Sequence, residues 1–142
     1  MSSQDQTAAR YPLGENAAEQ IHSRTGVPLD EITLEAVRTG RLASHDLTVD
    51  PATLRRQSAI AAAAGYRQLA ANLERAAELV EIPNERLLRL YEALRPQRST
   101  YEELLAWSNA LEAEHGARAN AQLIRQAAEA YRAAGLLRED TP

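Results

Sequence analysis

The sequence predicts an all-α protein, a small open up-and-down helical bundle with three or more core helices and an irregular N-terminal subdomain. Three observations lead to this prediction. From residue 50 onward, apolar residues recur at the three- and four-residue spacing of a helix face. Candidate caps and glycines divide that stretch into several helices. No window of the sequence shows the sustained alternation of apolar and polar residues that is typical of a strand.

The chain is expected to divide into three parts. Residues 1–10 are mostly polar and are expected to form a flexible tail. Residues 11–49 contain prolines and glycines at short intervals, which indicates an irregular N-terminal subdomain with one short helix. Residues 50–142 carry the sustained helical periodicity and are expected to form the helical bundle.

Local signals place the first helices. Thr33 is expected to cap a short helix over residues 34–39, since its hydroxyl can accept a hydrogen bond from an N–H of the first turn. Asp50 is the next candidate cap, and Pro51 suits the first helical position, where its missing N–H costs nothing. This second helix is expected to end at Gly65, because glycine readily adopts the conformation that follows a helix.

Two further helices are expected, one over residues 66–80 and one from Pro83 to Arg95. The first should pack one face into the core, and the residues of that face are Tyr66, Leu69, Leu73, Ala76 and Val80. In the second, Tyr91 belongs to the apolar face together with several leucines. The large side chains of Leu73 and Tyr91 are therefore expected to be buried.

The helix that begins near residue 100 has two overlapping capping boxes. Ser99 pairs with Glu102 in one of them and Thr100 with Glu103 in the other, and the sequence leaves both open. The helix is expected to end at Gly116. A last helix should extend to Ala134 and bury a stripe made of Ala121, Ile124, Ala128 and Tyr131.

Composition excludes several kinds of chemistry and of partner. The chain has no cysteine, which excludes disulfides, iron–sulfur clusters and thiol nucleophiles. All sixteen basic residues are arginine, so Schiff-base chemistry on a lysine is excluded as well. The net charge of −4 disfavours nucleic acid, and no apolar run is long enough for a membrane helix. Neither nucleic acid nor a membrane is therefore expected as a partner.

The sequence contains no motif for a reaction site. The histidines His22, His45 and His115 have no partner at a metal-ligand spacing. The paired glutamates are explained by ion pairs on helix surfaces, such as Glu85 with Arg89. We therefore predict no catalytic, no cofactor-binding and no metal-ligating residue in this chain.

One segment differs from the acidic remainder of the chain by its positive charge. Residues 86–98 contain four arginines and a single acid, Glu92. Arg95 and Arg98 flank a turn, where two planar guanidinium groups suit pairing with carboxylates of an acidic partner surface. Arg95 and Arg98 are thus candidate partner-docking residues. The alternative, a solvated turn whose charges interact with the end of a helix, stays open.

Longer sequence runs are similar to a known family. They read NLERAAEL at residues 72–79, IPNER at 82–86 and YEALRPQRST at 91–100, and shorter matches flank them in the same order. Together they resemble the small (gamma) subunit of adenosylcobalamin-dependent diol and glycerol dehydratases. The resemblance extends over residues 11–137, nearly the whole chain.

The resemblance implies a structural role in a larger lyase. Such enzymes convert 1,2-propanediol or glycerol to the corresponding aldehyde and water by a radical mechanism. The family's large subunit is a barrel that holds the substrate, and adenosylcobalamin lies between the large and medium subunits. The implied partners are therefore these two subunits, in a dimer of heterotrimers. The small subunit would pack on the large one, inactive alone and without a bound cofactor.

A different class of function stays open beside this one, a free-standing helical adaptor or regulatory protein. As to location, no signal peptide opens the chain, so the cytoplasm is expected. Diol dehydratases enclosed in bacterial microcompartments typically have a longer N-terminal extension than this chain. The short tail therefore favours the cytoplasm over a microcompartment.

Overall fold

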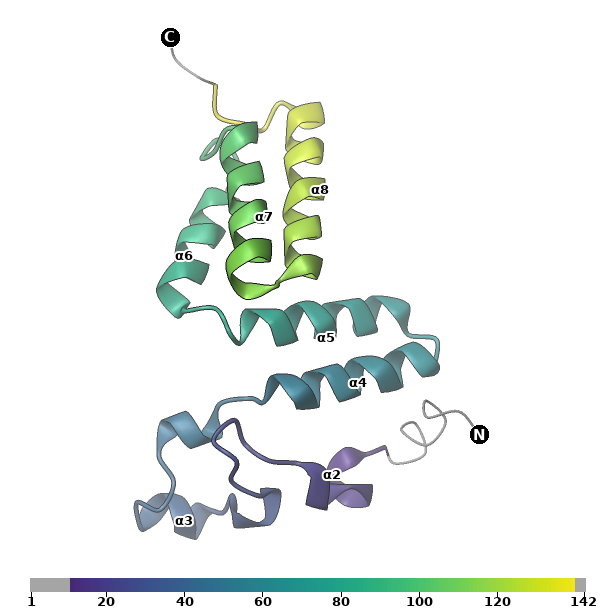
Figure 1. Cartoon of the computed structure of the whole chain (residues 1–142), viewed down its shortest axis with the longest axis vertical. Coiled ribbons are helices and arrows are strands. Elements are labelled where there is room, and N and C mark those ends of the chain that lie inside the picture. Colours follow the sequence, from purple (N-terminus) through teal and green to yellow (C-terminus); the bar gives the residue numbers. More distant parts are fainter. Residues whose placement is uncertain (1–10, 140–142) are drawn as a thin grey trace. The chain divides into compact units, whose positions relative to one another are not determined.

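The computed structural model describes residues 11–139 and groups them into two compact units, which meet between Val80 and Glu81. Within the described range the chain forms seven α-helices and three short 3-10 helices (Figure 1). The only strand-like pairing there is a single bridge between His22 and Pro28. The all-α prediction is confirmed. The predicted tail lies outside the described residues, and the predicted bundle over 50–142 stays a prediction.

The first part of unit 1 consists of short elements joined by turns. These are α2 (Leu13–Asn16), η1 (Ala18–Gln20), η2 (Leu29–Glu31), α3 (Leu34–Arg38) and η3 (Ser44–Leu47). The hydroxyl of Thr33 accepts a hydrogen bond from the N–H of Ala36 at 3.2 Å, so the predicted cap of α3 is confirmed. Asp46 connects two turns, because its carboxylate accepts hydrogen bonds from the Ala43 N–H and the Thr25 hydroxyl.

The main feature of unit 1 is an antiparallel helix pair, α4 (Pro51–Ala63) and α5 (Arg67–Leu79) (Figure 1). As predicted, α4 begins with the Asp50 cap and with proline at the first helical position. Gly65 separates the two helices with a φ of 85°, a conformation that side chains with a Cβ rarely adopt. The chain can therefore reverse direction within a few residues.

The buried face of α5 differs from the predicted one. Ala70 and Ala77 are its buried residues, whereas Tyr66 and Leu69 are 65% and 51% exposed. The reason is the close packing of α4 on α5. Alanines at the contact, including Ala61 of α4, let the two backbones approach closely. A shift of one residue along a helix turns the face by about 100°, and this shift places the larger side chains outside.

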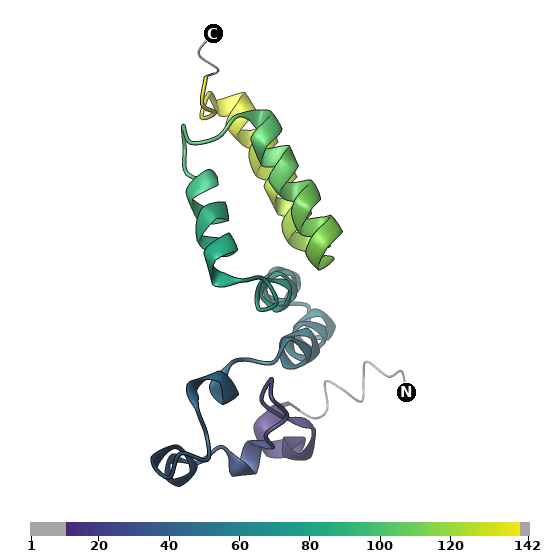
Figure 2. The same cartoon turned by 60° about the vertical axis from the view of Figure 1, so that its left-hand side comes forward.

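Unit 2 consists of α6 (Asn84–Ala93), α7 (Tyr101–His115) and α8 (Arg118–Ala134). In both views α7 and α8 lie side by side in opposite directions, whereas α6 diverges from α7 (Figure 1, Figure 2). Gly116 and Gly135 end the last two helices in the left-handed conformation. The core contains the inner face of α7, with Leu104, Ser108 and Leu111, and three residues of the predicted α8 stripe, Ala121, Ile124 and Ala128. The fourth residue of that stripe, Tyr131, is only half-buried.

The structure decides between the two capping boxes at the start of α7. The Thr100 hydroxyl accepts a hydrogen bond from the Glu103 N–H, and the Glu103 carboxylate accepts one from the Thr100 N–H. Ser99 has another role, since its hydroxyl donates to the carbonyl oxygen of Ala93 at 2.8 Å. Ser99 thus holds the end of α6 to the start of α7, and Thr100 caps the helix.

The prediction that Tyr91 is buried is wrong. Leu90 is the buried residue of α6 at 3% exposure, whereas Tyr91 and Leu88 are 54% and 68% exposed. Tyr131 of α8 makes the inward contact instead, because its hydroxyl donates to the carbonyl oxygen of Leu94 at 2.6 Å. The face of α6 is therefore set by contacts that lie 37 residues apart in the sequence.

Truncation of the unit 2 core is expected to destabilise the chain. Leu104 and Leu111 are fully buried, so Leu104→Ala and Leu111→Ala should each lower the free energy of unfolding by about 2–5 kcal/mol. Leu123→Ala, at a 44% exposed position of α8, is the control and should cost about 0.5 kcal/mol. Urea unfolding followed by the fluorescence of Trp107, the single tryptophan, measures all three. An equal loss in the control would contradict this core.

Candidate functional site

The candidate docking residues Arg95 and Arg98 lie on a turn that is fixed to the end of α8. Gln97 between them adopts a φ of 64°, which is unusual for a residue other than glycine. Its backbone N–H donates to the carbonyl oxygen of Leu136 at 2.9 Å, and its side-chain amide donates to that of Gly135 at 3.0 Å. Two hydrogen bonds from Gln97 to carbonyl oxygens at the end of α8 thus hold the turn in place.

Both candidate arginines contact the same carboxylate. Arg95 Nη1 lies 3.0 Å from Glu92 Oε2, and Arg98 Nε lies 3.2 Å from Glu92 Oε1. The side chains of Arg95 and Arg98 are 63% and 55% exposed. One glutamate therefore neutralises two guanidinium groups in part, and the turn keeps an exposed positive charge.

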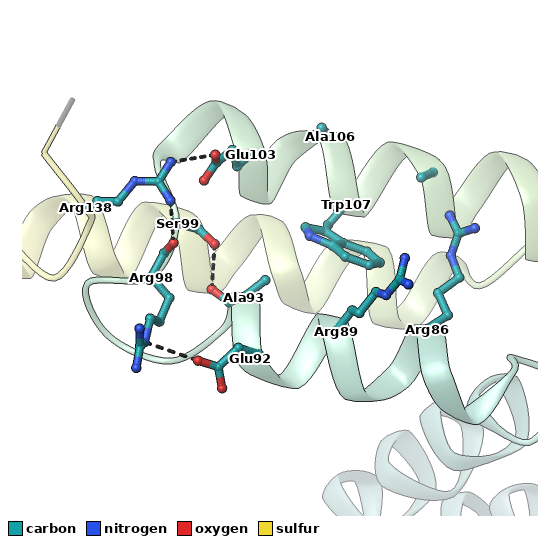
Figure 3. A pocket seen from close by; sticks show the side chains of 11 residues that line it. Arg86, Arg89, Glu92, Ala93, Arg98, Ser99, Glu103, Ala106, Trp107 and Arg138 are labelled. Carbon is teal, nitrogen blue, oxygen red and sulfur yellow. Dashed lines mark hydrogen bonds and ion pairs between the residues drawn. The ribbon is translucent and has the colours of Figure 1, made fainter. Parts of the chain in front are cut away.

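A cleft of about 660 Å³ lies between α6 and α7, next to this turn. Figure 3 shows Trp107 projecting from α7 toward Arg89 on α6. The guanidinium of Arg86 lies 5.8 Å from the centre of the Trp107 ring, within range of a cation–π interaction. The Nε atom of Arg86 is buried and has no hydrogen-bond acceptor among residues 11–139. The cleft therefore combines one aromatic ring with charged walls.

Ion pairs within unit 2 reduce the positive charge that the sequence segment shows. In the fold, four glutamates from three parts of unit 2 contact five arginines of the cleft and turn. The pairs are Arg86–Glu114, Arg89–Glu85, Arg95–Glu92, Arg98–Glu92 and Arg138–Glu103, at N–O distances of 2.6 to 3.2 Å. Two of the three excess positive charges counted along residues 86–98 are thus offset by glutamates outside the segment, one from α7 through the Arg86–Glu114 pair and one from the preceding turn of α6 through the Arg89–Glu85 pair.

Two carboxyl groups of unit 2, those of Glu103 and Glu112, have a lowered pKa. The backbone N–H of Thr100, followed by the guanidinium of Arg138, lowers the pKa of Glu103 below its ordinary value. The hydrogen bond from Arg125 lowers the pKa of Glu112 in the same way. These shifts stabilise the fold around the cleft rather than create an acid or base, because a lowered carboxyl pKa favours a permanent anion at neutral pH.

The histidines lie apart from this cleft. His22 takes part in the single bridge of unit 1, and His45 lies 3.4 Å from Asp46 with its ring exposed. His115 is in the last turn of α7. Over residues 11–139, no group of three histidine or acidic side chains is placed to hold a metal ion. The absence of catalytic and cofactor-binding residues stays a prediction.

A second hollow, in unit 1, was missed by the sequence analysis. This α4–α5 groove has a volume of about 400 Å³, and its lining consists of Tyr11, Gln57, Ile60, Ala61, Ala64, Tyr66, Leu69 and Leu73. The periodicity of apolar residues placed Tyr66 and Leu69 in the core, so the sequence analysis did not predict that they line an open groove. The alanine run before Gly65 was the available signal, because two helices that meet through alanines leave their larger side chains elsewhere.

Comparison with known proteins assigns the family. A family model described as dehydratase small subunit matches residues 6–138. The chain belongs to the dehydratase small subunit family. Its members are named as small subunits, so other subunits of a dehydratase are their partners. No helix within the described range is long and apolar enough to cross a membrane.

Two relatives from this dehydratase family are similar over most of the chain. The propanediol dehydratase small subunit of Salmonella typhimurium (strain LT2) is 45% identical over 121 residues, which are 85% of this chain and 70% of the relative. The propanediol dehydratase small subunit of Citrobacter freundii is 43% identical over the same shares. The resemblance found in the sequence is confirmed, and the chain is a dehydratase subunit rather than a free-standing adaptor.

The capping box of α7 gives an expected pH dependence. Because folding lowers the pKa of Glu103, its carboxylate stabilises the fold fully above the unfolded pKa, and this stabilisation is lost as the pH falls below about 4. The free energy of unfolding should therefore decrease less between about pH 6 and about pH 3 in Glu103→Gln than in the unaltered chain. Glu102→Gln, at the neighbouring exposed position, is the control and should leave the loss unchanged. Urea midpoints at the two pH values measure it, and equal slopes for both variants would contradict the assignment.

Proposed function

We propose that this chain is the structural small subunit of a diol or glycerol dehydratase. The observation that carries the proposal is the 45% identity to a propanediol dehydratase small subunit over 85% of the chain. The assembled enzyme would convert 1,2-propanediol or glycerol to the corresponding aldehyde and water. This chain would pack on the large catalytic subunit beside a medium subunit, in a cytoplasmic dimer of heterotrimers.

The cofactor of the proposed enzyme is adenosylcobalamin, held by the other subunits. When bound there, it supplies the radical that starts the dehydration. The residues of this chain do not fit such a site. The cleft between α6 and α7 is lined by arginines and glutamates that already pair with each other, and the α4–α5 groove presents alanine, leucine and tyrosine side chains. No catalytic step is therefore assigned to this chain.

The distribution of apolar side chains supports a subunit role. Unit 1 has a small core cluster of Leu13, Ala17 and Ile60, with Ile21 packed against it. Seven of its larger apolar side chains are exposed, namely Tyr11, Leu34, Val37, Leu47, Val49, Tyr66 and Leu69. Apolar surface removed from water contributes roughly 25 cal/mol per Å². Burial of these side chains against another subunit would therefore stabilise both.

The arginine turn supports the same role. Arg95 and Arg98 are exposed, fixed in one conformation and share a single carboxylate. Guanidinium groups have several donors in a planar arrangement, so each can donate hydrogen bonds to a second carboxylate, from a partner. We assign Arg95 and Arg98 to docking on the large subunit.

The assembled set of subunits is expected to be active and the single chain inactive. Co-expressed with large and medium dehydratase subunits, this chain should co-purify with them in a fixed ratio. The assembly should form aldehyde from 1,2-propanediol or glycerol only when adenosylcobalamin is added. Leaving out this chain should lower the solubility or the activity of the other two. Aldehyde formation by this chain alone, or an unchanged enzyme without it, would contradict the proposed function.

Reversal of the charges on the turn is expected to weaken assembly. If Arg95 and Arg98 pair with carboxylates of the large subunit, Arg95→Glu/Arg98→Glu should cost about 2–5 kcal/mol of binding free energy. A solvated turn would lose about 0–1 kcal/mol. Arg38→Glu/Arg41→Glu in unit 1 makes the same change in net charge and is the matched control. The amount of large and medium subunit that co-purifies with each variant is measured at increasing salt concentrations. Equal yields for the two variants would favour the solvated turn.

A further inference from the structure

We propose that the α4–α5 groove is a docking surface for an apolar, uncharged surface of another dehydratase subunit. This inference rests on the proposed function, because it takes for granted that the chain assembles with other subunits. It names the surface of unit 1 that makes the contact. The groove is concave, has exposed side chains and has no charge in its lining.

Three exposed side chains form the walls of the groove. Tyr11 is 62% exposed, Tyr66 is 65% exposed and Leu69 is 51% exposed. Ile60 is buried at 8% exposure and lines the same hollow. A concave surface with exposed tyrosines and a packed apolar base is typical of the positions that contribute most to binding energy at protein interfaces.

The lining selects the chemistry of the occupant. All residues that line the groove are uncharged, and Gln57 is its only amide. A charged group placed there would lose its water and find no opposite charge, which is unfavourable. An apolar side chain placed there would remove apolar surface from contact with water, which is favourable. The occupant that fits is therefore a protruding apolar surface.

Within the described part of unit 1, residues 11–80, the groove stays open, because Tyr66 and Leu69 of its lining are 65% and 51% exposed. The largest fully buried side chains among the described residues are Leu104, Ser108 and Leu111, and all three belong to unit 2. The ten residues before Tyr11 read MSSQDQTAAR, in which only methionine and two alanines are apolar. That segment supplies little apolar surface to fill a hollow of about 400 Å³. The other subunits of a dehydratase, which the family description implies, can supply such a surface.

The cleft between α6 and α7 is the less suitable of the two hollows. Arg86, Arg89 and Arg138 of its lining each have a carboxylate partner of their own at 2.6 Å. A partner that entered it would have to replace ion pairs that exist in the free chain, at a desolvation cost. The groove of unit 1 presents apolar surface to water, so its burial requires no such exchange. This difference favours the groove as the apolar contact.

The absence of cysteine permits a direct test. Leu69→Cys places the only thiol of the chain in the groove, and Leu88→Cys places one at a 68% exposed position of α6 as the matched control. Each variant is treated with iodoacetamide, both alone and assembled with the large and medium subunits, and alkylation of this chain is followed by mass spectrometry. Assembly should slow alkylation at position 69 at least tenfold and change position 88 less than threefold.

Four outcomes would overturn the inference. The first is an unchanged rate at position 69 in the assembled enzyme, and the second is equal protection at both positions. The third is a slow reaction in the isolated chain that deletion of residues 2–10 accelerates, which would make the chain's own N-terminal segment the occupant. The fourth is a rate that falls as the isolated chain is concentrated, which would indicate a second copy.

A second pair of variants measures the energetic contribution of the groove. Tyr66→Ser/Leu69→Gln should weaken co-purification with the other subunits at least tenfold, while the circular dichroism spectrum of the isolated chain stays helical. Leu88→Gln/Tyr91→Ser removes exposed apolar surface of the same kind from α6 and should leave assembly within threefold. Equal effects would overturn the inference. If the unaltered chain fails to co-purify at all, the proposed function fails, and this inference with it.

Discussion

Close contact between paired helices is the constraint on which both units depend. In unit 1 the hydroxyl of Ser58 on α4 donates to the carbonyl oxygen of Ala70 on α5 at 2.9 Å. In unit 2 the hydroxyl of Ser108 on α7 donates to the carbonyl oxygen of Ala121 on α8 at 3.0 Å. A short serine side chain reaches a neighbouring backbone only if the helices lie close together. Alanines at the contacts make this approach sterically feasible.

The same constraint has different consequences in the two units. In unit 2, Leu104 and Leu111 pack inward from α7, so the α7–α8 pair encloses a core of its own. In unit 1 the α4–α5 contact consists largely of alanine, and the tyrosines and Leu69 remain outside. Unit 1 thus leaves large apolar side chains exposed that another subunit can cover, which suits a member of a family named as small subunits.

Ion pairs between arginine and glutamate limit the positive charge on the surface of unit 2. Every arginine of the α6–α7 cleft has a carboxylate partner within unit 2, so the chain carries many guanidinium groups without a strongly positive surface. Arg95 and Arg98 differ, because they share Glu92 and remain exposed. Apolar and charged candidates for docking therefore lie on separate units, an apolar groove on unit 1 and an arginine turn on unit 2.

The sequence by itself determined the helical class, most helix ends and the family. Caps such as Thr33 and Asp50, and glycines such as Gly65, act through neighbouring backbone groups, so their effect is readable over a few residues. The family could be recognised because runs such as NLERAAEL are long enough to be specific.

Only the tertiary structure decided which faces are buried and where the charges are neutralised. Periodicity gives several neighbouring faces of α5 similar apolar character, and the contact with α4 selected the one with Ala70 and Ala77. The structure also decided between Ser99 and Thr100 as the cap of α7. The Ser99 hydroxyl donates a hydrogen bond to the carbonyl oxygen of Ala93 at the end of α6, and Thr100 caps the helix. Helical spacing indicated the local pair Glu85–Arg89, whereas pairs between elements such as Arg86–Glu114 join residues far apart in the chain and leave no local signal in the sequence.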